Sequence, residues 1–427
     1  MSFFVFRTPQ TIVYGNDSFQ QVGAEASAYG KKALIVSDNI IEKLGYVREC
    51  QRYLRSEGIQ SVVYTGVNSE PTDEYVAEAL ALQKKERCDL VISIGGGSCI
   101  DTVKAVAVLA TNGGYIGDYM DDQKKVTRQP MPHMAIPTTA GTGSEATDVT
   151  VITNTADDVK MMIKQPAFMP SVALVDPVLT QSSPGRVTAA TGIDALSHAI
   201  EAYLSKRAQP MTDTLALSAM RLITRNIRQA YREGDDVAAR EAMSLGSLQA
   251  GMAFTNASVC LVHGMSRPIG ALFHVPHGVS NAMLLPAVLQ FSKDACIERL
   301  ADLGRIFLSQ GAESCDRGSQ PTEAAADQPK QATKFSKEAT RLSDREAADV
   351  AVREVNQLCI DLQILNVREW GIDEQTFNDA IEKMAEDALA SGSPANNPRV
   401  PTKDEIVALY RVCYDYDYSC ASVGVAE

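Results

Sequence analysis

The chain has 427 residues, of which 45% are hydrophobic and 22% are charged, and its formal net charge is −13. This length predicts two or three domains, and the acidic balance argues against nucleic acid or an anionic membrane as a partner. Nine cysteines are scattered without a Cys-x-x-Cys pair, which is typical of reduced thiols in a cytoplasmic protein. No apolar run is long enough to span a bilayer, and the first residues lack the features of a secretory signal.

A strand–helix pattern repeats through the first 180 residues. Short apolar runs predict strands within 3–14 and at 33–37, 61–64, 90–94, 134–137 and 171–177. Helical stretches are predicted at 40–56, from Pro71 onward and at 99–109. Near-continuous β-branched runs that alternate with helices indicate a parallel sheet covered on both faces. We therefore assign residues 1–180 to an α/β domain with a parallel sheet.

Residues 95–98, Gly-Gly-Gly-Ser, stand where a strand ends and a helix begins. Glycines at this point let backbone N–H groups approach a pyrophosphate, and a helix N-terminus favours anions. The alternative is a tight turn in which Ser98 and Asp101 form a capping box. The triplet does not follow the Gly-x-Gly-x-x-Gly pattern.

Two further strand ends carry polar residues. Asp38 follows the first buried strand, where an acid accepts hydrogen bonds from ribose hydroxyls and repels a 2′-phosphate, although a surface turn is an equal alternative. Residues 138–144 are dense in hydroxyl groups and small side chains, which suits a wall against a nicotinamide or a flexible loop.

The pattern changes after Pro177 and Pro184. Apolar spacing near 3.6 predicts helices at 212–227, 238–254, 297–308, 350–362, 374–389 and 403–414. We therefore assign residues 181–427 to an all-helical domain. Within it, residues 311–345 are polar and poor in large apolar side chains, which predicts a disordered insertion.

Asp194 and His198 are four residues apart in a helical pattern, so both leave one helix face a single turn apart. His263 and His277 follow, and the chain has only five histidines. One carboxylate and three imidazoles suit a divalent first-row metal such as Fe²⁺ or Zn²⁺. A buried, hydrogen-bonded Asp–His pair is the alternative for the first two residues alone.

These segments resemble the metal site of the iron-containing (group III) alcohol dehydrogenases. In that family an Asp and a His on one helix and two later His hold the ion, and all four positions are occupied here by Asp194, His198, His263 and His277. The resemblance continues through residues 95–98 and 137–145 and covers nearly the whole chain, apart from a stretch after residue 310. It implies a dehydroquinate synthase-like architecture, an NAD-binding α/β domain followed by a helical metal domain, and a homodimer.

The resemblance also implies coenzyme contacts. It places Gly96, Gly97 and Ser98 on the phosphates, and Asp38 favours NAD over NADP. Further contacts carry over to Thr138, Thr139, Thr142, Ser144, Val151 and Lys160. Glu70 departs from the Asn that family members often carry before the Pro of this loop, so a coenzyme contact there is not expected.

The expected activity is a metal-dependent, NAD(H)-dependent interconversion of a primary alcohol, diol or hydroxy acid with its aldehyde or ketone by hydride transfer. The family favours Fe²⁺, with Zn²⁺ as the alternative. Arg267 is the sharpest departure, since many family members have there a second His that helps relay the proton. Arginine stays protonated, but it binds carboxylates well. His274 is the only nearby titratable replacement for the relay, although a satisfied surface or core histidine is the stronger interpretation.

Three alternatives remain open on the residues alone. A glycerol-type dehydrogenase and a sugar-phosphate cyclase of the dehydroquinate synthase type share the fold but usually use a different ligand set. A non-catalytic nucleotide-binding module with a structural metal belongs to another class.

Overall fold

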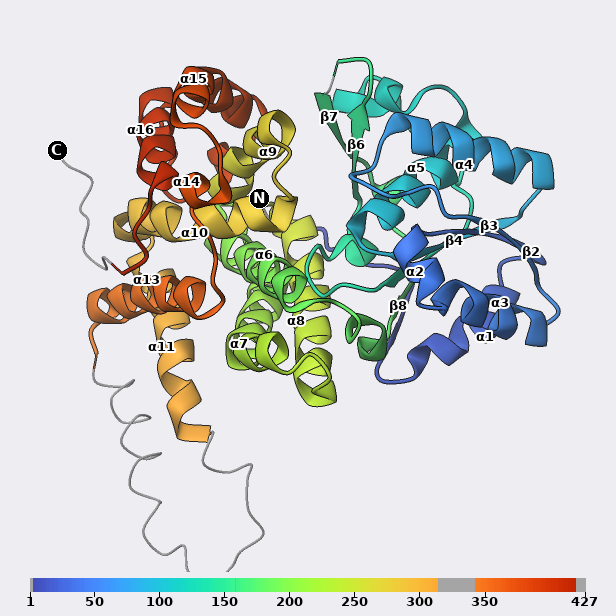
Figure 1. The fold of residues 1–427 in the computed structure, drawn as a ribbon, viewed down its shortest axis with the longest axis horizontal. Coiled ribbons are helices and arrows are strands. Elements are labelled where there is room, and N and C mark those ends of the chain that lie inside the picture. Colours follow the sequence, from blue (N-terminus) through green and yellow to red (C-terminus); the bar gives the residue numbers. More distant parts are fainter. Residues whose placement is uncertain (1–2, 158, 314–341, 420–427) are drawn as a thin grey trace, which may run out of the picture.

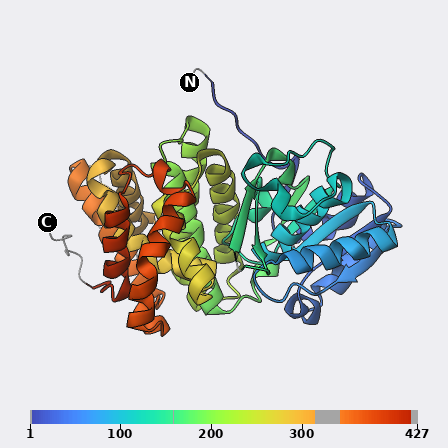
Figure 2. The same ribbon diagram turned by 90° about the horizontal axis from the view of Figure 1, so that it is seen from above.

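In a computed structural model, which describes residues 3–157, 159–313 and 342–419, the chain forms two domains side by side (Figures 1 and 2). The N-terminal domain contains a six-stranded sheet in the order β1-β8-β5-β4-β2-β3, and all its strand pairs are parallel. The strands are β1 (Thr11–Tyr14), β2 (Lys32–Val36), β3 (Gln60–Tyr64), β4 (Leu90–Gly95), β5 (His133–Pro137) and β8 (Val172–Val175). This confirms the α/β class that the apolar runs predict.

Helices cover both faces of the sheet, as expected for strands buried on both sides. Alternate residues of β2 enter opposite cores: Leu34 and Val36 lie in one cluster, whereas Ala33 and Ile35 lie in the other. The helices are α1 (Val22–Ser27), α2 (Asn39–Lys43), α3 (Tyr46–Ser56), α4 (Asp73–Glu86) and α5 (Gly97–Asn112). The single helix predicted at 40–56 is two helices, because Gly45 takes a left-handed conformation with φ +91° between them.

A hairpin of β6 (Val149–Asn154) and β7 (Val159–Lys164) was not predicted from the sequence. Its strands are half-buried, so their apolar residues do not form the continuous runs seen in the main sheet. The hairpin reaches the second domain, where the Lys164 ammonium donates to the carbonyl of Thr255 at 2.8 Å.

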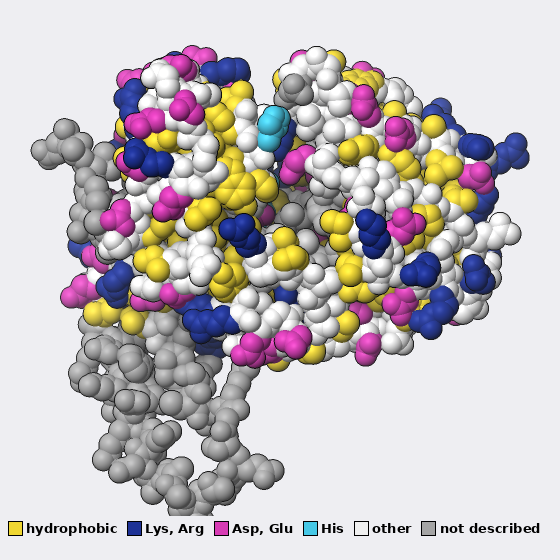
Figure 3. Space-filling model, in the orientation of Figure 1, with side chains coloured by type: hydrophobic (Ala, Val, Ile, Leu, Met, Phe, Trp, Pro, Cys, Tyr) yellow, Lys and Arg dark blue, Asp and Glu magenta, His cyan; other side chains and the backbone are white. Residues whose placement is uncertain are grey.

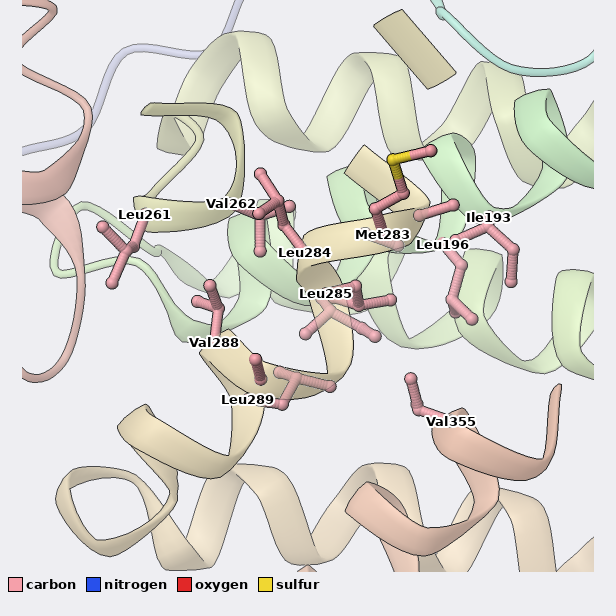
Figure 4. Packing of buried hydrophobic residues seen from close by; sticks show 14 of the residues in the cluster. Ile193, Leu196, Leu261, Val262, Met283, Leu284, Leu285, Val288, Leu289 and Val355 are labelled. Carbon is pink, nitrogen blue, oxygen red and sulfur yellow. The ribbon is translucent and has the colours of Figure 1, made fainter. Parts of the chain in front are cut away.

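The C-terminal domain is helical throughout its described residues, as predicted. Its central helix is α6 (Gly185–Leu204), which packs against α7, α8 and α10. Ile193 and Leu196 of α6 lie beside Met283 of α10 in the core (Figure 4). The remaining helices are α7 (Pro210–Arg232), α8 (Val237–Ala257), α9 (Leu261–Phe273), α10 (His277–Ser292), α11 (Ile297–Glu313), α13 (Asp344–Asp361), α14 (Val367–Trp370), α15 (Glu374–Ala390) and α16 (Lys403–Tyr414).

Helices occupy both ends of the insertion predicted at 311–345. The helix α11 extends to Glu313, and α13 begins at Asp344 with the Ser343 hydroxyl accepting from the backbone N–H of Glu346. The predicted boundaries therefore fall inside helices, and residues 314–341 lie outside the described residues. Among the described residues no single helix could cross a membrane; α8 and α9 together pass the length and composition test but are bent by 102°.

Candidate metal centre and coenzyme cleft

The four candidate metal ligands come together although they lie on three helices. Asp194 and His198 lie on α6, His263 lies on α9, and His277 is the first residue of α10. The ligand atoms all lie within 4.8 Å of one another. From Asp194 Oδ1 the distances are 3.8 Å to His198 Nδ1, 3.6 Å to His263 Nε2 and 4.0 Å to His277 Nε2. The one-turn spacing on α6 places the first pair, and packing of α9 and α10 against α6 adds the rest.

The pKa values of the residues in this cluster favour the binding of a cation. Burial raises the pKa of Asp194, but the three neighbouring histidines outweigh it and hold that pKa below its usual range. Burial lowers the pKa of His198 to about 4 and that of His277 to about 3. Burial also lowers the pKa of His263, but the Glu201 and Asp194 carboxylates outweigh it and raise that pKa. At neutral pH the cluster therefore offers the Asp194 carboxylate and the neutral imidazoles of His198 and His277, which are the forms that bind metals.

Two further residues hold the ligands, and the sequence analysis missed both. The Glu201 carboxylate lies 2.6 Å from His263 Nδ1 and also accepts from the backbone N–H of Val262 at 2.6 Å. Glu201 follows His198 by three residues on α6, so the helical spacing was the available signal. The Asn281 amide nitrogen donates to Asp194 Oδ1 at 2.7 Å and lies 3.2 Å from His263 Nε2 and 3.1 Å from His277 Nε2.

Phe254 of α8 stacks on the candidate ligand His198, with ring centroids 4.2 Å apart and an interplanar angle of 15°. It also lines the cleft beside the cluster. Phe273, at the end of α9, packs instead in the core against Phe377, with ring centroids 5.8 Å apart.

These residues fit a divalent cation. The buried Nδ1 of His198 has no hydrogen-bond partner, so its lone pair is available within 4 Å of the Asp194 carboxylate. A buried polar atom of this kind is costly unless something binds it. One carboxylate and three imidazoles are the donor set of Fe²⁺ and Zn²⁺ sites.

A cleft of about 460 Å³ joins the metal cluster to the N-terminal domain. His198, His263 and His277 line one side of it, and Gly97 and Ser98 line the other. Figure 3 shows the hollow between the two domains, with a histidine and a basic side chain at its edge. This position, at the carboxyl ends of parallel strands, is where open α/β sheets bind ligands.

The glycine-rich turn after β4 opens the helix α5. Gly95 has φ +156°, and a Cβ atom on Gly97 would lie 2.9 Å from the Thr142 side chain, so the turn needs glycine at both points. Gly96 is the N-cap residue, and no side chain caps the helix. The alternative capping box is therefore not formed, since Asp101 accepts from the Ser144 hydroxyl and from the backbone N–H of Val151.

The loop at 138–144 lies against this turn. A buried lysine, Lys104 of α5, holds the loop by donating to the Ser144 hydroxyl and the Thr147 hydroxyl at 2.8 Å each and to the Val149 carbonyl at 2.6 Å. The predicted coenzyme residues divide into two groups. Those that line the cleft are Gly97, Ser98, Thr142, Ser144, Val151 and Lys160, whereas Asp38, Gly96, Thr138 and Thr139 lie outside its lining.

Asp38 lies at the carboxyl end of β2 and caps α2. Its Oδ1 accepts from the backbone N–H groups of Ile40 and Ile41, both at 2.8 Å. Its Oδ2 lies 4.0 Å from Cys99 Sγ, beside the glycine turn. One carboxylate oxygen thus supports the helix and the other faces the strand end.

Arg267 stands where many family members have a relay histidine, and His274 is the candidate replacement; the two residues lie in different places. Arg267 lies one turn after His263 on α9 and lines the cleft, where its Nη1 donates to the Ser393 hydroxyl at 2.9 Å. His274 is exposed, ends α9 in a left-handed conformation with φ +54°, and does not line the cleft. The structure does not bring His274 to the cluster.

A buried cation-ready cluster that faces a glycine-rich helix N-terminus across one cleft defines a class of protein, the metal-dependent nicotinamide oxidoreductases. The model of iron-containing alcohol dehydrogenases matches residues 9–177, and the model of the C-terminal domain of Fe-containing alcohol dehydrogenases matches residues 188–414. The chain belongs to the iron-containing alcohol dehydrogenase family.

Individual relatives agree with the family match. The chain is 37% identical to a 1,3-propanediol dehydrogenase of Klebsiella pneumoniae, over 96% of this chain and 99% of that one. It is 36% identical to an NAD-dependent methanol dehydrogenase of Bacillus methanolicus, over 95% and 98%. A crystal structure of 1,3-propanediol oxidoreductase superposes with a TM-score of 0.86 at 37% identity and covers 96% of this chain and 100% of that one. The protein is an NAD(H)-dependent and metal-dependent alcohol–aldehyde oxidoreductase.

Proposed function

We propose that Asp194, His198, His263 and His277 hold one divalent ion, with Fe²⁺ favoured over Zn²⁺ by the family. We propose further that NAD(H) binds across the cleft, with its diphosphate at residues 96–98 and its nicotinamide beside the loop at 138–144. The observation that carries this proposal is that one cleft is lined both by the three histidines and by the N-terminus of α5.

When bound, the ion supplies a Lewis acid for the substrate oxygen, and the nicotinamide supplies the hydride acceptor or donor. The residues of the chain orient both partners. Glu201 holds the Nδ1 proton of His263 and so turns Nε2 toward Asp194, since a histidine ligand is positioned by its second nitrogen. Phe254 fixes the ring plane of His198 and gives the cleft an apolar wall that limits water.

On the coenzyme side, the N-terminus of α5 presents backbone N–H groups to an anion. Lys104 and Asp101 bind the neighbouring loop to α5 and fix its distance from the glycine turn. The remaining predicted contacts, Asp38, Thr138 and Thr139, support the strand ends from outside the cleft lining.

The test is the double variant D194A/H263A, compared with the exposed substitution D404A on α16. We expect the double variant to lose bound metal and to lose NADH formation with 1,3-propanediol or butanol, and D404A to retain both. Full turnover by the double variant after loading with iron or zinc overturns the metal assignment.

The setting of the enzyme is also a proposal. We propose a cytoplasmic homodimer that acts on a small alcohol or aldehyde, with a domain boundary near residue 180. The described cysteines Cys50, Cys88, Cys99, Cys260, Cys296, Cys359 and Cys413 are all free and buried, which suits a reducing compartment. The last strand ends at Val175 and the first helix of the second domain begins at Gly185, which supports the boundary. Light scattering of the purified protein tests the dimer.

A further inference from the structure

Arg267 brings a positive charge into the cleft beside the metal cluster. It follows His263 by one helical turn on α9, so both side chains leave the same face of the helix. Both residues line the cleft together with Ser393. The Ser393 hydroxyl, at 2.9 Å, is the only hydrogen-bond acceptor of the Arg267 guanidinium among the residues that the structure describes.

No carboxylate within the described ranges forms an ion pair with Arg267. The carboxylate whose charge acts on Arg267 is Glu201, and it is already bound to His263 and to the backbone of Val262. Burial lowers the pKa of Arg267 to about 10, so the guanidinium remains charged at neutral pH. Arg267 is half-buried, and a partly desolvated charge without a counterion is stabilised when an anion binds to it.

The other cations of the cleft differ from Arg267. Lys160 pairs with Glu70 at 3.3 Å, and Lys164 pairs with Asp148 at 3.6 Å. Arg207 also lines the cleft but is exposed, so water solvates its charge. Arg267 is half-buried and has no ion-pair partner among the described residues, so it marks one place in the cleft for an anion.

We propose that Arg267, oriented by Ser393, binds an anionic head group of the substrate, a carboxylate or a sulfonate, and that the preferred substrates are short hydroxy acids and their aldehydes. This inference rests on the proposed function of the metal cluster. Four residues separate Arg267 from His263, or about 6 Å along α9, which fits an anion three or four bonds from the reacting carbon. The planar fork of arginine matches both oxygens of such a group.

The experiment compares two aldehydes of equal chain length, 4-oxobutanoate and butanal, in NADH-dependent reduction. We expect the wild type to prefer 4-oxobutanoate in kcat/KM, and R267Q to lose about 10- to 100-fold of that preference through a higher KM for the charged aldehyde. R267K should lose less, since it keeps the charge but not the fork. R411Q on α16, an exposed control, should keep the wild-type ratio. Sulfoacetaldehyde against acetaldehyde forms a second arm that distinguishes sulfonate from carboxylate.

Each outcome decides the proposal. An unchanged ratio in R267Q, with thermal unfolding like the wild type, overturns it. A raised KM for NADH with an unchanged aldehyde ratio also overturns it, because Arg267 then serves the coenzyme. If R267Q does not fold, two other measurements test the proposal: the aldehyde preference of R267K, and the inhibition of wild-type butanal reduction by succinate. A wild-type preference in R267K together with no inhibition by succinate overturns the proposal. Failure of the proposed function is separate, since the wild type then reduces neither aldehyde.

Discussion

The two sides of the cleft are built by different means. On the side of the proposed metal site, the groups offered are side chains: a carboxylate and imidazoles project from α6, α9 and α10, and Glu201 and Phe254 contact them. On the side of the proposed coenzyme site, the groups offered are mostly backbone N–H groups: a turn of three glycines opens α5, and a loop of small hydroxyl residues lies against that turn. The candidate ligands lie on helices that share one hydrophobic core.

This difference explains why the two sides respond differently to substitution. A metal ligand has a defined atom to remove, whereas a backbone N–H group persists in any variant except proline. Side chains near the coenzyme therefore act through charge, through capping and through the support of the loop. We expect four substitutions to test this difference between the two sides, and their expected effects decrease in the order given below.

The largest effect is expected at Glu145, which is buried directly after the loop at 138–144. Burial raises the pKa of its carboxyl group from 4.5 to about 7. The unfolded chain therefore ionises first as pH rises, so the contribution of this group to stability is complete below about pH 4.5 and is lost as pH rises to about 7. We expect E145Q to gain up to about 3 kcal/mol of unfolding free energy at pH 8 that it does not gain at pH 4.5. Urea unfolding at both pH values measures this, and equal gains contradict it.

On the metal side, E201Q should weaken the ion without removing a ligand. Glutamine still accepts from the backbone of Val262, but it loses the charge-assisted hydrogen bond to His263 Nδ1. We expect the affinity for Zn²⁺, measured by chelator competition, to fall about 10- to 100-fold. E298Q, an exposed change on α11, is the control, and an unchanged affinity in E201Q would show that packing alone orients His263.

A smaller effect is expected from D38N on the coenzyme side. Asparagine caps a helix as well as aspartate does, so α2 should keep its bonds to Ile40 and Ile41 and the melting temperature should not change. The lost negative charge no longer repels a 2′-phosphate. We expect the preference for NAD⁺ over NADP⁺ in kcat/KM to fall about tenfold, or about 1.4 kcal/mol. A constant preference would mean that Asp38 acts only as a cap.

The smallest effect is expected from H274A. The proton-relay role suggested by the sequence requires this side chain to reach the cleft, but His274 is exposed and lies outside the cleft lining. We expect the pH–rate profile of alcohol oxidation to remain that of the wild type. A displaced limb in the profile would restore His274 as a relay and would mean that α9 rearranges when substrate binds.

The sequence alone determined the parts of this protein that depend on local spacing. Asp194 and His198 share a helix face because they are four residues apart, and the continuous apolar runs around Ile35 and Ile92 identify a buried parallel sheet. His263 and His277 could be named as partners because histidine is rare in the chain and because of the family resemblance. Each of these inferences uses neighbours along the chain or a known motif.

The tertiary structure decided what depends on contacts between distant segments. It stacked Phe254 on His198, brought Asn281 to Asp194, and placed Arg267 in the cleft while leaving His274 outside it. It also revealed the hairpin of β6 and β7, whose half-buried strands carry no continuous apolar run. The physical reason is that helical spacing sets which side chains share a face, whereas burial and partners are set by how whole elements pack together.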